Sequence, residues 1–360
     1  MEKIKLGIFI LLILIGGILG GCSSKSEEKE NEVDGAPKEE ADTDQSSLEN
    51  IKYLFTANEG GSITKINAST NEVVDTIKVD GAVHNVQVSP DGKTLGATVV
   101  PEMGHGSHDE DSMEMKGKAL FFDTATNDLL KSIEVGNHPA HIVFTENGKY
   151  AVVTNNEDND LSIIDTESFT LVETVETGKG PHGFRISTDS QKAYIANMGE
   201  DTISVINLEE MKEEKKIKLG STPVTTGITS DGKTLLVTLY AENMLAIVDL
   251  ATDHVKKVEV GKGPAQVYVD GNNQFAYVAN QGTEDEPSTS VSVIDLGSMK
   301  VKTSIETGKG AHGVVTSPDS KRLYVTNMFE NTVTVINTEQ NKVIDKIDVG
   351  EIPNGISIMK

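Results

Sequence analysis

The segment Lys321–Gly350, "KRLYVTNMFENTVTVINTEQNKVIDKIDVG", decides the fold. It contains three short runs of β-branched or alternating apolar residues, LYVTN, TVTVIN and KVIDKIDV, separated by turn residues. Such runs predict β-strands. A run of the same kind, GVVTSP, precedes them at residues 313–318. Four strands in one unit are typical of a β-propeller blade.

The same unit recurs along the chain, for example at Gln191–Gly220 and Gly148–Gly178. Its fourth run occurs seven times, as NVQVSP, HIVFTE, GFRIST, TGITSD, QVYVDG, GVVTSP and GISIMK. Internal repeats override the two-domain expectation that the chain length alone would give. We therefore predict an all-β fold, a seven-bladed β-propeller of four-stranded blades over residues 51–360, and we exclude an α-solenoid.

The two ends of this region are incomplete blades. It begins at YLFTAN, with the second strand of a blade, and ends at GISIMK, with a first strand. We expect the C-terminal strand to pair with the three N-terminal strands, because this pairing closes the ring and removes exposed sheet edges.

The repeat resembles a known family. YVTN at 324–327, together with YIAN, YVAN, VVTN, TVTVIN, SVIDL and GKGPHG, is similar to the YVTN β-propeller repeats of exported bacterial and archaeal proteins. The resemblance covers nearly the whole repeat region and implies the propeller fold. It implies no single function, because the family includes surface proteins, lipoproteins and cofactor-handling relatives. The absence of tryptophan excludes WD40 repeats.

The N-terminal residues 1–21 are typical of a lipoprotein signal peptide. MEKIK forms a charged N-terminal region, and the apolar run LGIFILLILIGGI is shorter than a transmembrane helix requires. LGGC at 19–22 resembles the lipoprotein box, so we predict lipidation of Cys22, the only cysteine. The expected location is the cell membrane, lipid-anchored and facing outside the cytoplasm. The alternative is an incidental cysteine after an uncleaved helix.

Residues 22–50 are polar and acidic, which predicts a disordered tether. The whole chain has a net charge of −24 and no cluster of Lys or Arg. Binding to nucleic acid depends on such clusters, so the sequence excludes that class of partner. We expect a monomer that contacts the membrane through its anchor.

Histidines gather on one predicted face. Antiparallel strands reverse at each connection, so the loop between the second and third strands lies on the same face as the link between blades. The links carry histidines, and one second-to-third-strand loop holds the insertion PEMGHGSHDEDSMEMKG at 101–117. His254 alone is expected on the opposite face. The predicted metal ligands are His84, His105, His108, His138, His141, His182, His312, Met103, Met113 and Met115.

Imidazole with thioether and carboxylate suits copper best, with zinc as the alternative. A structural interpretation stays open, in which the link histidines hydrogen-bond to backbone groups and the insertion is a solvated loop. Other polar residues are predicted to line the central channel or, alternatively, to join hydrogen bonds between blades. They are Gln87, Arg185, Tyr268, Asn155, Asn197, Asn280 and Asn327.

No G-x-S-x-G elbow, H-E-x-x-H motif or P-loop is present, so we predict a non-enzymatic binding protein. Its ligand is predicted to be a transition-metal ion, copper favoured, or a metal-bearing molecule. One alternative is a scaffold for protein or cell-wall partners, with structural histidines. A second is a cofactor-handling or lactonase-like propeller enzyme.

Overall fold

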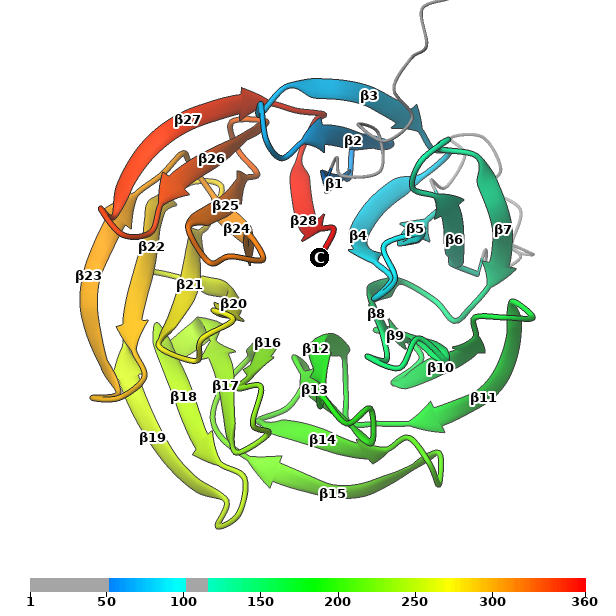
Figure 1. Cartoon of the computed structure of the whole chain (residues 1–360). Coiled ribbons are helices and arrows are strands. Elements are labelled where there is room, and N and C mark those ends of the chain that lie inside the picture. Colours follow the sequence, from blue (N-terminus) through cyan, green and yellow to red (C-terminus); the bar gives the residue numbers. More distant parts are fainter. Residues whose placement is uncertain (1–51, 102–115) are drawn as a thin grey trace, which may run out of the picture. The chain divides into compact units, whose positions relative to one another are not determined.

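The computed structural model describes residues 52–101 and 116–360. In this part of the chain, seven four-stranded antiparallel sheets form the blades of one ring (Figure 1). The predicted seven-bladed β-propeller is therefore confirmed. Cys22, Met103, His105, His108, Met113 and Met115 lie outside the described residues.

Each blade runs from an innermost strand at the channel to an outermost strand at the rim. In that order, the first three blades are β4 (Ala82–Val88), β5 (Thr94–Val100), β6 (Lys118–Asp123) and β7 (Leu129–Glu134); β8 (Pro139–Phe144), β9 (Tyr150–Asn155), β10 (Asp160–Asp165) and β11 (Thr170–Glu176); and β12 (Pro181–Ile186), β13 (Lys192–Asn197), β14 (Thr202–Asn207) and β15 (Lys212–Lys218). The next two are β16 (Pro223–Ile228), β17 (Thr234–Leu239), β18 (Met244–Asp249) and β19 (His254–Glu259); and β20 (Pro264–Val269), β21 (Phe275–Gly282), β22 (Pro287–Asp295) and β23 (Lys300–Glu306). The last two are β24 (Ala311–Thr316), β25 (Arg322–Asn327), β26 (Thr332–Asn337) and β27 (Lys342–Asp348); and β28 (Pro353–Ile358), β1 (Tyr53–Asn58), β2 (Ser62–Asn67) and β3 (Val73–Lys78). One short 3-10 helix, η1 (Tyr240–Glu242), joins β17 to β18.

The ring closes as the sequence predicts. Strand β28 pairs antiparallel with β1, with Phe55 opposite Ser357 and Leu54 opposite Ile358. In Figure 1 the C-terminal strand lies beside β1 at the centre of the ring. The first and last parts of the propeller therefore share one sheet.

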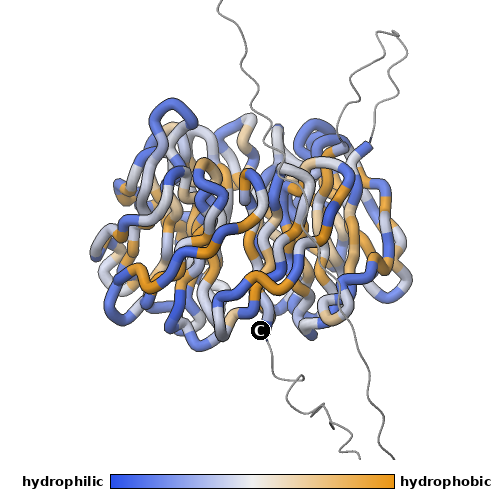
Figure 2. The backbone as a smooth tube through the Cα atoms, turned by 90° about the horizontal axis from the view of Figure 1, so that it is seen from above, coloured by the Kyte–Doolittle hydropathy of each residue, from blue (hydrophilic) through white to orange (hydrophobic). Residues whose placement is uncertain are grey.

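The core lies between neighbouring sheets. Leu161 and Phe184 come from adjacent blades, are fully buried, and belong to one apolar cluster. The fourth strands are mostly exposed, as in β27. Hydrophilic residues gather at the loops of both faces, while hydrophobic ones follow the strands (Figure 2). Within the described residues, no helix is long and apolar enough to cross a membrane.

A β-bulge interrupts every innermost strand near its start, because its register with the second strand shifts there. The threonine of the YVTN motif satisfies the backbone groups around this bulge. Thr326 Oγ1 accepts the Gly313 amide at 2.7 Å and donates to the Asn354 carbonyl of the next blade at 3.0 Å. This threonine therefore joins neighbouring blades.

The asparagine of the motif holds the link that enters the same blade. Asn327 Oδ1 accepts the Gly308 amide at 3.0 Å, and its Nδ2 donates to Thr334 Oγ1 at 2.8 Å. A Cβ atom at Gly308 would lie 2.6 Å from Asn327 Cγ, so this close approach requires glycine. The link glycine and the Thr-Asn pair of the motif thus recur because they make the same structural hydrogen bonds in several blades.

Candidate metal centre

Three histidines from adjacent blades meet at one end of the central channel. They are His84 on β4, His141 on β8 and His182 on β12, and one ring nitrogen of each lies within 4.8 Å of those of the other two. The ring centroids of His141 and His182 are 5.0 Å apart, and those of His84 and His182 are 5.3 Å apart. We call His84, His141 and His182 the three-histidine group.

The β-bulges place these side chains. His84 is the residue left unpaired between Val83 and Asn85. His141 lies in the unpaired stretch between Pro139 and Ile142, and His182 lies in the equivalent stretch of β12. Bulges turn side chains out of the ordinary alternation of a strand. Three consecutive blades therefore direct an imidazole toward the same point.

Glu59 fixes the orientation of the His84 ring. Its Oε1 lies 2.8 Å from His84 Nδ1 and also accepts a hydrogen bond from Asn354 Nδ2 at 2.7 Å. Burial raises the pKa of Glu59, but the hydrogen bonds and the charge of protonated His84 outweigh it and lower the pKa to about 2. The ionised carboxylate keeps a proton on Nδ1 and directs His84 Nε2 toward the group.

A carbonyl performs the same role for His182. His182 Nδ1 lies 3.2 Å from the Val224 oxygen, which can only accept a hydrogen bond, so Nδ1 carries the proton. His182 Nε2 then faces His84 Nε2 at 3.2 Å. Two imidazole lone pairs facing each other repel unless a cation lies between them. A metal ion between the two nitrogens would relieve this repulsion.

His141 is the most deeply buried member of the group, with 1% of its surface exposed. Neither of its ring nitrogens has a hydrogen-bond partner among the described residues. A buried polar atom without a partner costs about 1–3 kcal/mol. A metal ion beside His141 would remove part of that cost.

The buried rings are neutral at physiological pH. Burial, and then the charges of His84 and His312 when protonated, lower the pKa of His182 to about 3. Burial, and then the charges of His182 and His84, hold the pKa of His141 well below 6.5. Neutral imidazole is the form that binds metals.

The separation of one pair of ring nitrogens suits a tetrahedral ion, and a nitrogen of His141 lies within 4.8 Å of both. Imidazole nitrogens bind zinc at about 2.0–2.1 Å, which places two such ligands about 3.3 Å apart. The 3.2 Å between His84 Nε2 and His182 Nε2 is close to that value. Three protein ligands leave the fourth position of a tetrahedral ion open. The His84 side chain is 14% exposed, so the group is in contact with solvent.

The other described histidines lie outside the group. His312 is buried, with Nδ1 3.3 Å from the Asn354 carbonyl and 3.5 Å from Gln266 Nε2. His138 is exposed, and its Nδ1 lies 3.6 Å from Glu157 Oε1. His254 is exposed at the start of the outer strand β19.

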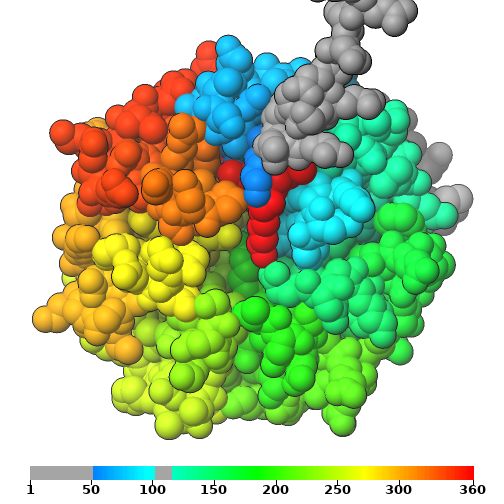
Figure 3. Space-filling view, viewed as in Figure 1, coloured from blue at the N-terminus to red at the C-terminus, as the bar shows by residue number. Residues whose placement is uncertain are grey.

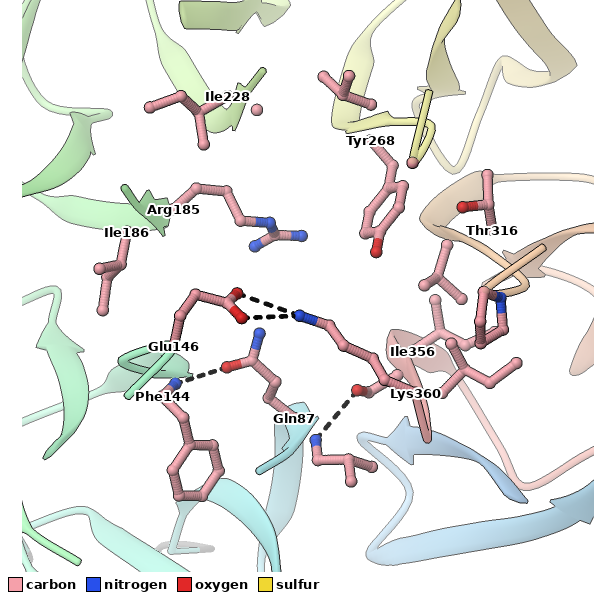
Figure 4. A pocket seen from close by; sticks show the side chains of 18 of the residues that line it. Gln87, Phe144, Glu146, Arg185, Ile186, Ile228, Tyr268, Thr316, Ile356 and Lys360 are labelled. Atoms are coloured by element: carbon pink, nitrogen blue, oxygen red, sulfur yellow. Dashed lines mark hydrogen bonds and ion pairs between the residues drawn. The ribbon is translucent and has the colours of Figure 1, made fainter. Parts of the chain in front are cut away.

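The remaining predicted site residues separate into two sets. Gln87, Arg185 and Tyr268 line a central cavity (Figure 4). Four asparagines do not line this cavity, because they are buried inside the blades and bond to serine or threonine on the third strands. They are Asn155, Asn197, Asn280 and Asn327.

Sequence reasoning missed Glu59 and Asn354 as supporting groups. Glu59 directly follows Asn58, the end of a second strand, and so lies on the face of the links. Asn354 occupies in its own blade the link position that His84 and His182 occupy in theirs. The same strand-direction argument that gathered the histidines could have placed both.

The comparisons with known proteins agree on the fold. The family model described as YNCE-like beta-propeller matches residues 117–360. The hydrazine synthase of Kuenenia stuttgartiensis is similar in structure, with a TM-score of 0.65, 19% identity, and coverage of 76% of this chain and 89% of that one. A putative 6-phosphogluconolactonase from Bacteroides fragilis gives a TM-score of 0.67 and 16% identity, covering 86% of this chain and 98% of that one. No match was found among curated protein sequences.

Proposed function

The chain belongs to the YNCE-like β-propeller family, and on that premise we propose that it is a non-enzymatic protein that binds one transition-metal ion at His84, His141 and His182. The observation that carries this proposal is the approach of His84 Nε2 to His182 Nε2 at 3.2 Å, while each Nδ1 faces an acceptor. Metal-binding histidines commonly donate their other N–H to a carboxylate or a backbone carbonyl. Glu59 and Val224 supply those two partners.

The chemistry of the donors favours copper. Imidazole suits zinc, copper, iron and nickel, and copper(II) binds a given site more tightly than the other divalent ions of the first transition row. The group contains no thiolate or thioether, so it does not favour copper(I). We therefore expect Cu(II) to bind most tightly and Zn(II) to bind measurably.

We also propose that a lipid on Cys22 holds the protein at the outer surface of the cell membrane. Support comes from the LGGC sequence after the apolar N-terminal run. Membrane fractionation of Cys22→Ala tests this part separately, and an unchanged membrane fraction would contradict it.

Calorimetric titration of metal-free, untagged protein with Cu(II) and Zn(II) tests the metal site. The titrations use a His105→Ala/His108→Ala background, because residues 102–115 carry two further imidazoles. We expect one Cu(II) per chain in that background. His182→Ala should lose more affinity than the roughly 10- to 100-fold typical of removing a supporting group.

His254→Ala is the matched control, because His254 is exposed on an outer strand away from the group. It should bind Cu(II) like its parent. Equal losses in His254→Ala and His182→Ala, or no saturable site in the parent, would leave the three histidines with a structural role only.

A further inference from the structure

The central channel also contains a cavity beyond the three-histidine group. Further along the same innermost strands, a cavity of about 400 Å³ is lined by Gln87, Arg185 and Tyr268 among others. Figure 3 shows the molecule hollowed at the centre of the ring, beside the C-terminal residues. This volume lies within the range of about 300–1,000 Å³ that small-molecule sites occupy.

Arg185 brings an unpaired positive charge to this cavity. Its Nη1 donates to the neighbouring Phe184 carbonyl at 2.9 Å, and it forms no ion pair with any residue in the described ranges. A guanidinium offers five donors in a planar fork. Most of these donors therefore remain available in the cavity.

The carboxylates that line the cavity have other partners. Both oxygens of Glu146 contact Lys360 Nζ, at 3.0 and 3.1 Å. Asp270 accepts the backbone amides of Gln274 and Phe275 at 2.8 and 3.1 Å. Neither carboxylate supplies Arg185 with a counterion.

Two further donors point into the same space (Figure 4). The Tyr268 ring lies 5.9 Å from Arg185 Cζ, and no hydrogen bond joins its hydroxyl to another described residue. Gln87 Oε1 accepts the Phe144 amide at 2.6 Å, which leaves its NH2 group free to donate. A guanidinium, a phenol and an amide thus converge on this cavity, and the only carboxylate drawn beside them, that of Glu146, is paired with Lys360 (Figure 4).

Apolar side chains form much of the wall, including Ile142, Ile186, Ile228 and Ile356. We propose that this cavity binds a small organic monocarboxylate, with its carboxylate on Arg185, Tyr268 and Gln87 and its apolar body against the isoleucines. A carboxylate matches the fork of arginine in two parallel hydrogen bonds. One guanidinium with two neutral donors balances one negative charge, which favours a carboxylate over a phosphate dianion.

Calorimetry on metal-free protein tests this proposal independently of the metal site. The probes are benzoate and hexanoate, their neutral amides benzamide and hexanamide, and phenyl phosphate. We expect saturable binding of the carboxylates, at least about 10-fold tighter than that of the amides, which lack the charge. Phenyl phosphate should bind more weakly than benzoate.

Two variants assign the effect to named groups. Arg185→Gln should remove the preference for carboxylate over amide, and Arg185→Lys should keep part of it. Arg322→Gln is the matched control, because the Arg322 side chain donates to the Ala68 carbonyl at 2.8 Å and does not line the cavity. It should bind benzoate like the parent.

Thermal melts show whether Arg185→Gln is folded. If it is not, Tyr268→Phe replaces it and should weaken benzoate binding several-fold. The proposal is overturned if no probe binds at about 10 mM, if amides bind as tightly as carboxylates, or if a folded Arg185→Gln keeps the preference.

Discussion

Glu59 and Val224 determine which nitrogens of His84 and His182 face each other. The carboxylate lies 2.8 Å from His84 Nδ1, and the carbonyl lies 3.2 Å from His182 Nδ1. Without these two acceptors, each ring could present either nitrogen. Tautomer selection by a second partner is what makes a histidine a defined metal ligand.

We predict that Glu59→Gln weakens Cu(II) binding by about 10- to 100-fold, because the amide loses the charge that holds the proton on His84 Nδ1. Titration calorimetry measures the change. Glu157→Gln serves as the control, since Glu157 lies 3.6 Å from His138, outside the three-histidine group. Equal affinities in the two variants would show that Glu59 does not support the site.

Acid should destabilise the metal-free protein in two steps. The pKa values of His182 and His312 fall from 6.5 to about 3 and about 4, mainly through burial. The unfolded chain therefore binds these protons first, so stability is complete above about pH 6.5 and is lost toward pH 4 and 3. The pKa of Glu59 falls from 4.5 to about 2, so a further loss follows between these values.

Urea denaturation from pH 7 to 4.5 measures the first step. Each histidine that stays neutral in the fold contributes a slope of up to about 1.4 kcal/mol per pH unit. His312→Asn should remove the slope of one histidine. A midpoint that is independent of pH over this range would contradict the burial of neutral histidines.

At the scale of single elements, much of the architecture could be predicted from residue alternation. Runs such as LYVTN and TVTVIN coincide with β25 and β26, because one face of each strand packs against a neighbouring sheet. The bulges were not predictable, since no residue type marks them. The asparagines were placed in the channel by position alone, whereas Asn327 bonds to Gly308 and Thr334 inside its blade.

We predict that Thr326→Val destabilises the propeller by about 1–3 kcal/mol, because it leaves the buried Gly313 amide and Asn354 carbonyl without their shared partner. Chemical denaturation measures this free energy of unfolding. Thr174→Val, on the exposed face of β11, is the matched control and should change stability little. Similar values for both variants would contradict the role of the threonine in joining blades.

At the scale of the whole molecule, ring closure depends on β28. This strand is buried and pairs with β1, and Ser357 Oγ accepts the Val88 amide of the next blade at 3.0 Å. Deletion of residues 354–360 should lower the Tm by about 10 °C or more, because it removes a whole buried strand; each kcal/mol corresponds to about 2–4 °C in chains of about 150–250 residues. Deletion of residues 23–50 is the comparison and should leave the Tm unchanged. Equal melting temperatures for the two deletions would contradict closure by β28.

The location of the site could be predicted only in part. Strand direction placed His84, His182 and His312 at one end of the channel, but sequence could not tell which of them meet. That depends on the curvature of the ring and on the bulges, which bring His84 and His182 together across the intervening blade of His141. His312 instead turns to the Asn354 carbonyl.

The most direct test is a crystal structure of the protein soaked with Cu(II), with an anomalous difference map at the copper absorption edge. We predict one strong peak about 2.0–2.1 Å from a nitrogen of His84, His141 and His182. Glu59 should remain on His84 Nδ1. A map without a peak between these three rings, at a copper concentration that saturates the protein in solution, would contradict the three-histidine metal centre.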